Sequence, residues 1–345
     1  SPTLPGFFPD QGELFTDSEL VSQSNAGLAA GLTSIAQMPN GDLHQVHAQA
    51  VAYQGWKESD ENQAKRLIAD AWCAAFVWIK HEHATPAIIN RVFRNLKEQG
   101  GSSLHGDTAT EIERLRDEYT FFHWHLEFPD IFHVKDDDLH DAPDSGWSGG
   151  FSCVLANPPW DKVDFEDKKY FSVVEPSIAE MTGQTRRRRI EQWQEEHEEE
   201  GVRYRAARRR VKATFSFAGN SGAFPECARG LTAPGVTMLQ TDQLFTERFA
   251  GTVAPEGRVG CIVPTAVATG AGGQFLFGEL TERGAVASLY DFENRRKLFP
   301  DVDSRQKFCL LSLAGKAVSE PATRYAFFLL DVSDLDTAGR VFALT

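Results

Sequence analysis

The chain has 345 residues, of which 41% are hydrophobic and 24% charged, as in a globular protein with a sizeable core. Its net charge of −14 argues against a protein coated in positive field, although a local basic strip can still contact nucleic acid. No apolar run is long enough to span a bilayer and no signal peptide is present, which favours a cytoplasmic protein without a membrane partner. The 5 cysteines form no CxxC pair, so buried free thiols are expected.

The first 120 residues favour an irregular arm followed by helices. Residues 1 to about 45 are rich in Pro, Gly, Ser and Asp, with room for one short helix. From residue 61 to about 97 apolar residues recur at three- and four-residue spacing, which indicates helix. A second helix is expected to start at Thr85-Pro86, and a third is expected over residues 108–119. We therefore predict a domain boundary near residue 120, with a second region over 121–345.

Residues 121–132 are dense in aromatic side chains. They include His123 and His125, and His133 follows directly. Such histidines are more often packed or hydrogen-bonded than metal-bound. No metal site is therefore predicted here.

The tetrapeptide Asn157-Pro158-Pro159-Trp160 is the most informative motif, because it follows an apolar run, residues 151–156, that predicts a buried strand. Two consecutive prolines fix two φ angles and hold the preceding residues extended, so the turn is stiff. The Pro158 carbonyl and the Asn157 side-chain oxygen are then two acceptors able to converge on one NH2 group. Such a grip favours methyl transfer to an exocyclic amine, and Trp160 offers an aromatic face to a flipped base. The alternative is a plain Pro-Pro turn with a core tryptophan.

A highly charged helical segment follows at about 180–215, with ten basic residues and six glutamates between residues 186 and 212. It is either a solvent-facing helical hairpin or an arm that contacts phosphates. The residues predicted to contact DNA are Lys162, Arg186, Arg187, Arg188, Arg189, Arg208, Arg209 and Arg210.

The C-terminal part alternates helices and strands, which predicts an α/β fold. Helices are expected over residues 241–250 and 275–283. Strands are expected near 264, where a turn precedes a short buried strand, and over 287–292, 307–313 and 325–331.

The turn, with residues 121–132, 150–161, 254–269 and 290–313, resembles the adenine-specific (N6) DNA methyltransferases of the large bacterial restriction–modification and phage-defence type, similar to type IIG enzymes. The resemblance covers about residues 60–345. It implies part of a Rossmann-like class I methyltransferase sheet, strands four to seven, behind a helical N-terminal part. It also implies S-adenosyl-L-methionine as cofactor and double-stranded DNA as partner, with other defence-system subunits as further candidates. The catalytic residues implied are Asn157, Pro158, Pro159 and Trp160.

The chain departs from this family in one respect, because no glycine loop of the type Asp-Pro-x-x-Gly-x-Gly-x-Phe is found. Gly270-Ala-Gly-Gly273 has no acidic partner about twenty residues later. Asn157 would lie at the edge of the cofactor site, and the remaining cofactor residues are expected upstream of Ser1. We therefore expect a middle segment of a larger methylase, without a target-recognition region and incomplete alone. Two alternatives stay open: methylation of another planar amine or amide, and a DNA- or partner-binding fragment without activity.

Overall fold

The computed structural model of the chain describes residues 24–79, 85–135, 146–232 and 238–345. The chain divides into two compact units, Ser1–Gly149 and Gly150–Thr345. Residues 121–132 therefore lie in the helical unit, and the Asn-Pro-Pro-Trp turn lies in the second unit. Half of the predicted irregular arm, residues 1–23, lies outside the described residues. Across the described ranges, no helix is long and apolar enough to cross a membrane.

The first unit is helical and is organised around α3. Its helices are α1 (Ala26–Ala36), α2 (Leu43–Lys57), α3 (Asp60–Val77), α4 (Asn90–Gln99), α5 (Gly106–Tyr119) and the single turn α6 (Trp124–Glu127), followed by the short strands β1 (Phe132–His133) and β2 (Ser148–Gly149). Small buried residues, Ala71 and Ala74, let neighbouring helices approach α3 closely, and α3 contacts α2, α4, α5 and α6.

Most of the predicted helices of this unit are present, but the second one starts later than expected. The prediction that it starts at Thr85-Pro86 is wrong, because the backbone is not helical before Asn90. Starting there places Phe93 and Leu96 on the buried face, so packing decides the boundary rather than the proline. The region before residue 45 also holds more helix than predicted, since α1 and the start of α2 both lie there.

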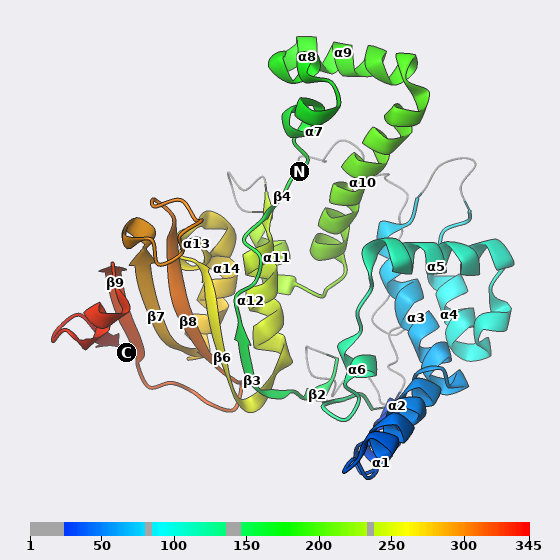
Figure 1. Cartoon of the computed structure of the whole chain (residues 1–345), viewed down its shortest axis with the longest axis horizontal. Coiled ribbons are helices and arrows are strands. Elements are labelled where there is room, and N and C mark those ends of the chain that lie inside the picture. The colour runs from blue at the N-terminus through cyan, green and yellow to red at the C-terminus, as the bar shows by residue number, and fades with distance from the viewer. Residues whose placement is uncertain (1–23, 80–84, 136–145, 233–237) are drawn as a thin grey trace. The chain divides into compact units, whose positions relative to one another are not determined.

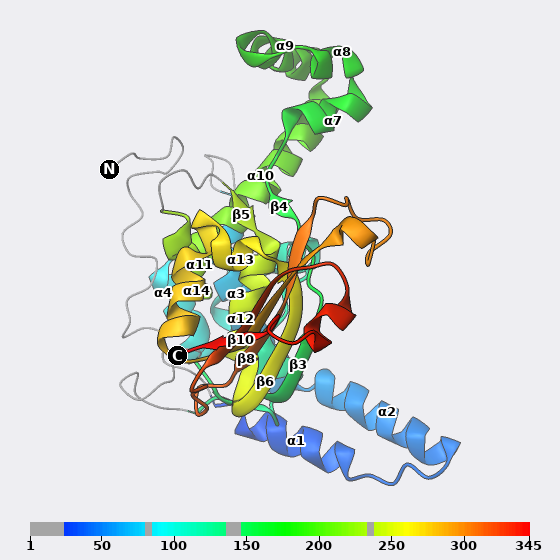
Figure 2. The same cartoon turned by 90° about the vertical axis from the view of Figure 1, so that its left-hand side faces the viewer.

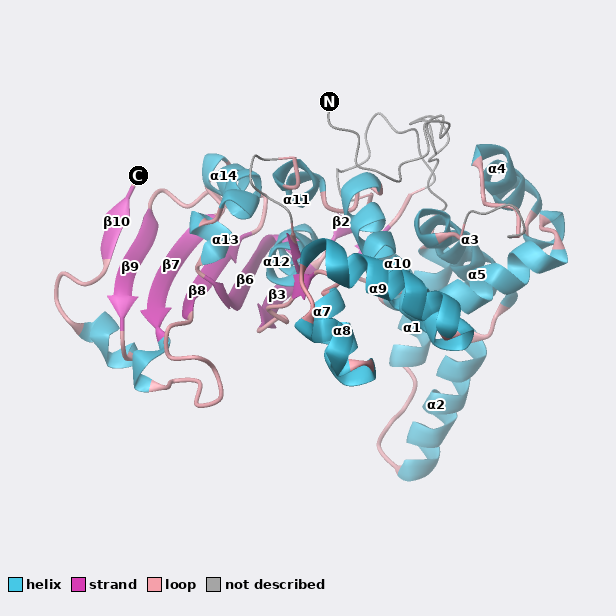
Figure 3. Cartoon of the chain, turned by 90° about the horizontal axis from the view of Figure 1, so that it is seen from above, coloured by secondary structure: helices cyan, strands magenta, loops and turns pink. Residues whose placement is uncertain are grey.

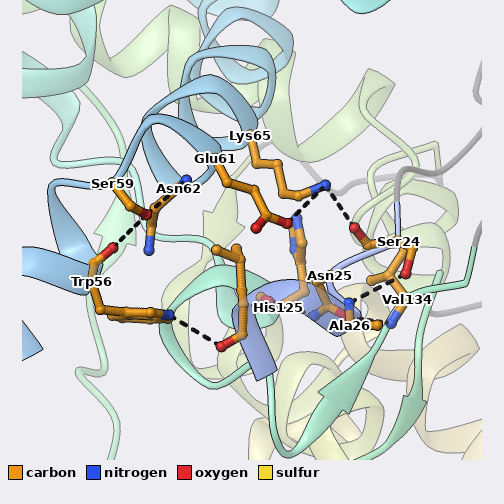
Figure 4. A network of polar contacts seen from close by, with 11 residues as sticks. Ser24, Asn25, Ala26, Trp56, Ser59, Glu61, Asn62, Lys65, His125 and Val134 are labelled. Atoms are coloured by element: carbon orange, nitrogen blue, oxygen red, sulfur yellow. Dashed lines mark hydrogen bonds and ion pairs between the residues drawn. The ribbon is translucent and has the colours of Figure 1, made fainter. Parts of the chain in front are cut away.

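Hydrogen bonds from Asn25 join the start of α1 to the segment around β1 (Figure 4). The side-chain nitrogen of Asn25 donates to the carbonyls of His125 and Phe132, both at 2.7 Å. Its side-chain oxygen accepts from the backbone amide of Val134 at 2.9 Å. The Lys65 ammonium donates to the carbonyl of Ser24 at 2.7 Å. A buried asparagine with its groups satisfied in this way fixes the two chain segments against each other.

The three histidines of the aromatic segment have structural surroundings. His123 is buried, and its Nε2 lies 2.7 Å from Oδ1 of Asp70 on α3. Burial, and then the neighbouring His123, lowers the pKa of His125 to about 4, so this ring is neutral at physiological pH. His133 is exposed in β1. The expectation that these histidines are packed or hydrogen-bonded is confirmed for His123.

The second unit is built on a mixed six-stranded sheet in the order β10-β9-β7-β8-β6-β3 (Figure 3). Its strands are β3 (Phe151–Ala156), β6 (Val253–Pro264), β7 (Val286–Glu293), β8 (Lys307–Ala314), β9 (Thr323–Leu329) and β10 (Phe342–Leu344). β3 is parallel to β6 and β7 is parallel to β9, whereas β8 runs antiparallel between β6 and β7. At the start of β3, Gly150 has a φ of +138°, and a side chain there would meet the Ala254 amide nitrogen at 2.6 Å.

Helices cover one face of this sheet, as Figure 1 shows. They are α11 (Pro225–Gly230), α12 (Thr241–Thr252), α13 (Ala266–Thr269) and α14 (Gln274–Glu282). Between them and the strands lies the main core, which includes Val263, Leu289 and Leu311. The opposite face carries a second cluster, centred on Phe292 and Phe308, against which Trp160 packs.

The strands and helices predicted for this unit are present within one to three residues at most ends. The turn expected before residue 264 is wrong, because residues 253–264 form one continuous strand. The strand predicted over residues 151–156 is confirmed as β3, but the expectation that it is buried is wrong. Within the described residues β3 pairs with β6 alone, and Leu155 is 85% exposed. An apolar run indicates a strand but not its place in the sheet. Membership in strands four to seven of a methyltransferase sheet stays a prediction.

A helical arm is inserted between β3 and α12. It comprises α7 (Asp167–Val174), α8 (Pro176–Glu180), α9 (Gly183–Glu196) and α10 (Glu198–Asn220), and it projects from one end of the sheet (Figure 2). The short strand β4 (Lys162–Val163) leads from the turn into the arm and pairs antiparallel with β5 (Leu239–Gln240), which directly precedes α12. The predicted charged helical segment corresponds to α9 and α10.

Candidate functional site

The Asn-Pro-Pro-Trp turn follows the carboxyl end of β3. Because β3 and β6 are parallel and Ala156 pairs with Cys261, the turn lies beside the carboxyl end of β6. The carboxyl edge of parallel strands is where α/β proteins commonly place ligands. The local geometry therefore puts the motif at an edge suited to binding.

The two predicted acceptors have no hydrogen-bond partner among the described residues. Asn157 is exposed, and neither its side chain nor the Pro158 carbonyl receives a hydrogen bond. The next carbonyl differs, because Pro159 O accepts from Thr241 Oγ1 at 2.7 Å. Thr241 also accepts the Asp161 amide at 2.9 Å and donates its own amide to Asp161 O at 3.0 Å. Thr241 thus fixes the end of the turn at Pro159 and Asp161, whereas at its start Asn157 is exposed and Pro158 is buried.

Trp160 is fixed to the sheet rather than free. Its indole N–H donates to the Ile262 carbonyl at 3.2 Å, and its ring stacks on Phe308 with centroids 6.3 Å apart. Phe299 meets it edge-on at 6.4 Å. Only part of the half-buried indole is left accessible, so stacking on a base stays a prediction for the exposed portion.

Asn294 is a supporting residue that sequence reasoning missed. It is fully buried, donates to the Phe299 carbonyl at 2.9 Å and accepts the Phe299 amide at 3.0 Å. It thereby positions the ring that borders Trp160. A lone asparagine, far from the motif in sequence, gave no signal beforehand. Thr241 was missed for the same reason, since it lies 80 residues after Asp161.

The residues predicted to contact DNA do not form one cluster. Lys162 is exposed in β4, two residues after the turn, whereas the arginines lie on α9 and α10. Arg186 donates to the carbonyls of Ile178 and Ala179, and Arg189 forms an ion pair with Glu196 at 2.8 Å. These two arginines therefore have structural partners within the arm, and DNA contact by any of the predicted residues stays a prediction.

The glycine-rich segment after β6 is explained by packing. A side chain on Gly273 would meet the Val267 carbonyl at 2.2 Å, and one on Gly270 would meet the Ala266 carbonyl at 2.7 Å. These glycines allow close contact with α13 and do not form an open cradle for a cofactor. Among the described residues, the acceptors for an amine are thus present without a glycine loop that fits S-adenosyl-L-methionine. No step is assigned through that group.

Asp242 is a buried acid that directly follows Thr241, the residue that bonds the Pro159 carbonyl. It lies in the first turn of α12, where the helix dipole favours a carboxylate, yet its Oδ2 has no partner among the described residues. Burial outweighs the dipole and raises the pKa of Asp242 to about 6. The folded state therefore holds its proton more tightly than the unfolded chain, and stability falls as pH rises from about 4 to about 6.

We expect Asp242→Asn to raise the free energy of unfolding at pH 7 by about 2 kcal/mol, because it removes a buried charge. At pH 4 the gain should nearly vanish, since the wild-type acid is then protonated when folded. Urea titrations at both pH values measure this, with the exposed Asp301→Asn as control. An equal gain at both pH values would contradict the raised pKa.

Comparisons with known proteins are sparse for this chain. No protein-family model and no curated protein sequence matches it. Among solved structures, the ATP-dependent Type ISP restriction-modification enzyme LlaBIII bound to DNA is similar over 64% of this chain and 14% of its own, at 10% identity and a TM-score of 0.29. A nuclease-deletion mutant of the Type ISP enzyme LlaGI with a DNA substrate mimic is similar over 92% and 35%, at 11% identity and 0.31. The chain thus spans about a third or less of either protein, and likeness at these scores carries no argument about fold or activity.

Proposed function

We propose that this chain carries the amine-binding part of an N6-adenine DNA methyltransferase of a restriction–modification or phage-defence system. One observation carries the proposal: at a sheet edge the exposed Asn157 side chain and the carbonyl of the buried Pro158 receive no hydrogen bond from the described residues, while Thr241 engages the next carbonyl. The two solved structures described above are restriction–modification enzymes bound to DNA or to a DNA substrate mimic, a role that the proposal shares but does not rest on.

The chemistry follows from what two acceptors do to an amino group. The N6 lone pair of adenine is delocalised into the ring, so the nitrogen is a poor nucleophile. Acceptance of one N–H bond by Asn157 and the other by Pro158 would favour a tetrahedral nitrogen and localise the lone pair. The methyl donor that the resemblance implies, S-adenosyl-L-methionine, would have to be held by residues other than the glycine segment described above. In duplex DNA the adenine must first leave the stack, at a cost of a few kcal/mol.

The rigidity of the turn supports the proposal. Two prolines limit the backbone, Thr241 bridges Pro159 and Asp161, and the Trp160 indole is bonded to β6. Acceptors held in this way need little reorganisation when the amine arrives, which is how positioning contributes to rate. The same grip would also suit another planar amine or amide, so the substrate class needs a direct test.

The test is labelled methyl transfer by the complete protein to two duplexes, one with adenine and one built only from G·C pairs. We expect label in the adenine-containing duplex alone. Label in RNA or protein but not in DNA would support the planar-amide alternative. Equal label in both duplexes would overturn adenine as the target.

A further inference from the structure

The helical arm has its own core. Phe171, Ile178, Ile190, Trp193 and Tyr204 are buried together. The Tyr204 hydroxyl also donates to Asp167 Oδ1 at 2.8 Å, which joins α10 to α7. The arm is therefore packed as a unit of its own, able to present a surface in a fixed geometry.

Acidic and basic residues occupy different parts of α10. Its first turn carries Glu198, Glu199 and Glu200, where the helix dipole favours acids. From Arg203 to Lys212 the helix then carries six basic residues and no acidic one. All of these basic side chains except the half-buried Arg209 are exposed. A run of this sign, without interleaved acids, is not braced by i,i+4 pairs within itself.

This positive charge contrasts with the rest of the protein. Between residues 183 and 212 the arm has ten basic and six acidic residues, a net charge of +4, whereas the whole chain carries −14. A basic surface on an acidic protein attracts a polyanion such as DNA. The stretch from Arg203 to Lys212 is about 15 Å long, and one DNA strand carries about four phosphates over that length.

The arm is joined directly to the candidate site. β4 begins two residues after Trp160, and β5 ends at Gln240, immediately before Thr241, which bonds the Pro159 carbonyl. The N-terminal end of the arm therefore starts beside the turn, whereas its C-terminal end continues from α10 into α11.

We propose that the basic surface of α10, residues 203–212, binds the phosphate backbone of duplex DNA beside the base held at the turn. The position beside that base rests on the proposed function, whereas the binding of phosphate does not. The sequence predicted DNA contact by Arg186 to Arg189 of α9 alike, but two of these four arginines bond other groups of the arm. Arg186 and Arg189 have partners within the arm, and on α10 Arg205 donates to Gln194 Oε1 at 3.2 Å. The proposal for α10 therefore rests on its run of exposed basic residues without acids between them.

The test compares two double variants of the complete protein. Arg208→Gln with Lys212→Gln removes two charges from one side of α10 and keeps long polar side chains. Arg258→Gln with Arg340→Gln removes two exposed charges elsewhere in the same unit. Binding is measured against salt with a short duplex of G·C pairs only, and thermal melting checks that each variant is folded.

We expect the arm variant to lower the slope of log K against log salt by about 2, roughly 0.9 per phosphate contact, and the control to leave it unchanged. An unchanged slope in the arm variant, or an equal loss in the control, would overturn the proposal. Because the probe lacks adenine, a protein that binds it through α10 but never methylates adenine would refute the proposed function alone.

Discussion

Replacing Asn157 with alanine should reduce methyl transfer to adenine by about 100- to 1,000-fold, the loss seen when one preorganised catalytic hydrogen-bonding group is removed. The side chain is exposed and has no hydrogen-bond partner in the described part of the chain, so its removal leaves no buried polar group there unpaired. We therefore expect stability to change by less than about 0.5 kcal/mol. A large loss of activity without a loss of stability is the result that separates a catalytic group from a structural one.

A matched control for this variant is Asn40→Ala. Asn40 is also exposed, lies in the helical unit and has no hydrogen-bond partner within the ranges that the structure describes. It should leave both activity and stability unchanged. Initial rates of labelled methyl transfer and urea titrations of all three proteins provide the comparison. A variant at Asn157 with at least half of the wild-type rate would refute its role as an acceptor.

Replacing Asp70 with alanine should have the largest effect on stability. The Asp70 carboxylate and the His123 ring are both nearly fully buried, 2.7 Å apart, and join α3 to the start of α6. Removal of the carboxylate leaves the ring nitrogen buried without a partner, which costs about 3 kcal/mol or more. Asp70→Asn retains a hydrogen-bonding group of the same shape and should cost less.

The chain offers a matched exposed pair as control. His105 and Asp107 lie 3.7 Å apart with both side chains more than three-quarters exposed. Water already solvates both groups, so Asp107→Ala should change the free energy of unfolding by less than about 0.5 kcal/mol. Urea titrations that gave equal losses for the buried and the exposed pair would contradict the structural role of Asp70.

Local patterns predicted much of the fold. Helical periodicity located α3, and the period-2 and apolar runs located β3, β7 and β8, because these signals arise from neighbours in sequence. The same patterns could not show that β3 lies at an edge of the described sheet, since strand order depends on contacts between distant segments. They also could not show that the segment around Pro86 is not helical.

The site divides in the same way. The turn could be predicted from the sequence, because the two prolines restrict the backbone within four residues. The residues that hold it, Thr241 and Asn294, could not be predicted, because they lie far from the turn in sequence and belong to no motif. The arginine run illustrates the limit most clearly. From the sequence, Arg186 and Arg189 were predicted to contact DNA just as the neighbouring arginines were, whereas in the structure each has a partner inside the arm.

The most direct test of the amine-binding turn identifies the methylated nucleoside. DNA incubated with the complete protein and S-adenosyl-L-methionine is digested to nucleosides and analysed by mass spectrometry, in parallel with the Asn157→Ala variant. The account predicts N6-methyldeoxyadenosine from the wild-type protein and almost none from the variant. A methyl group on any other base, or the same amount of N6-methyldeoxyadenosine from both proteins, would contradict it.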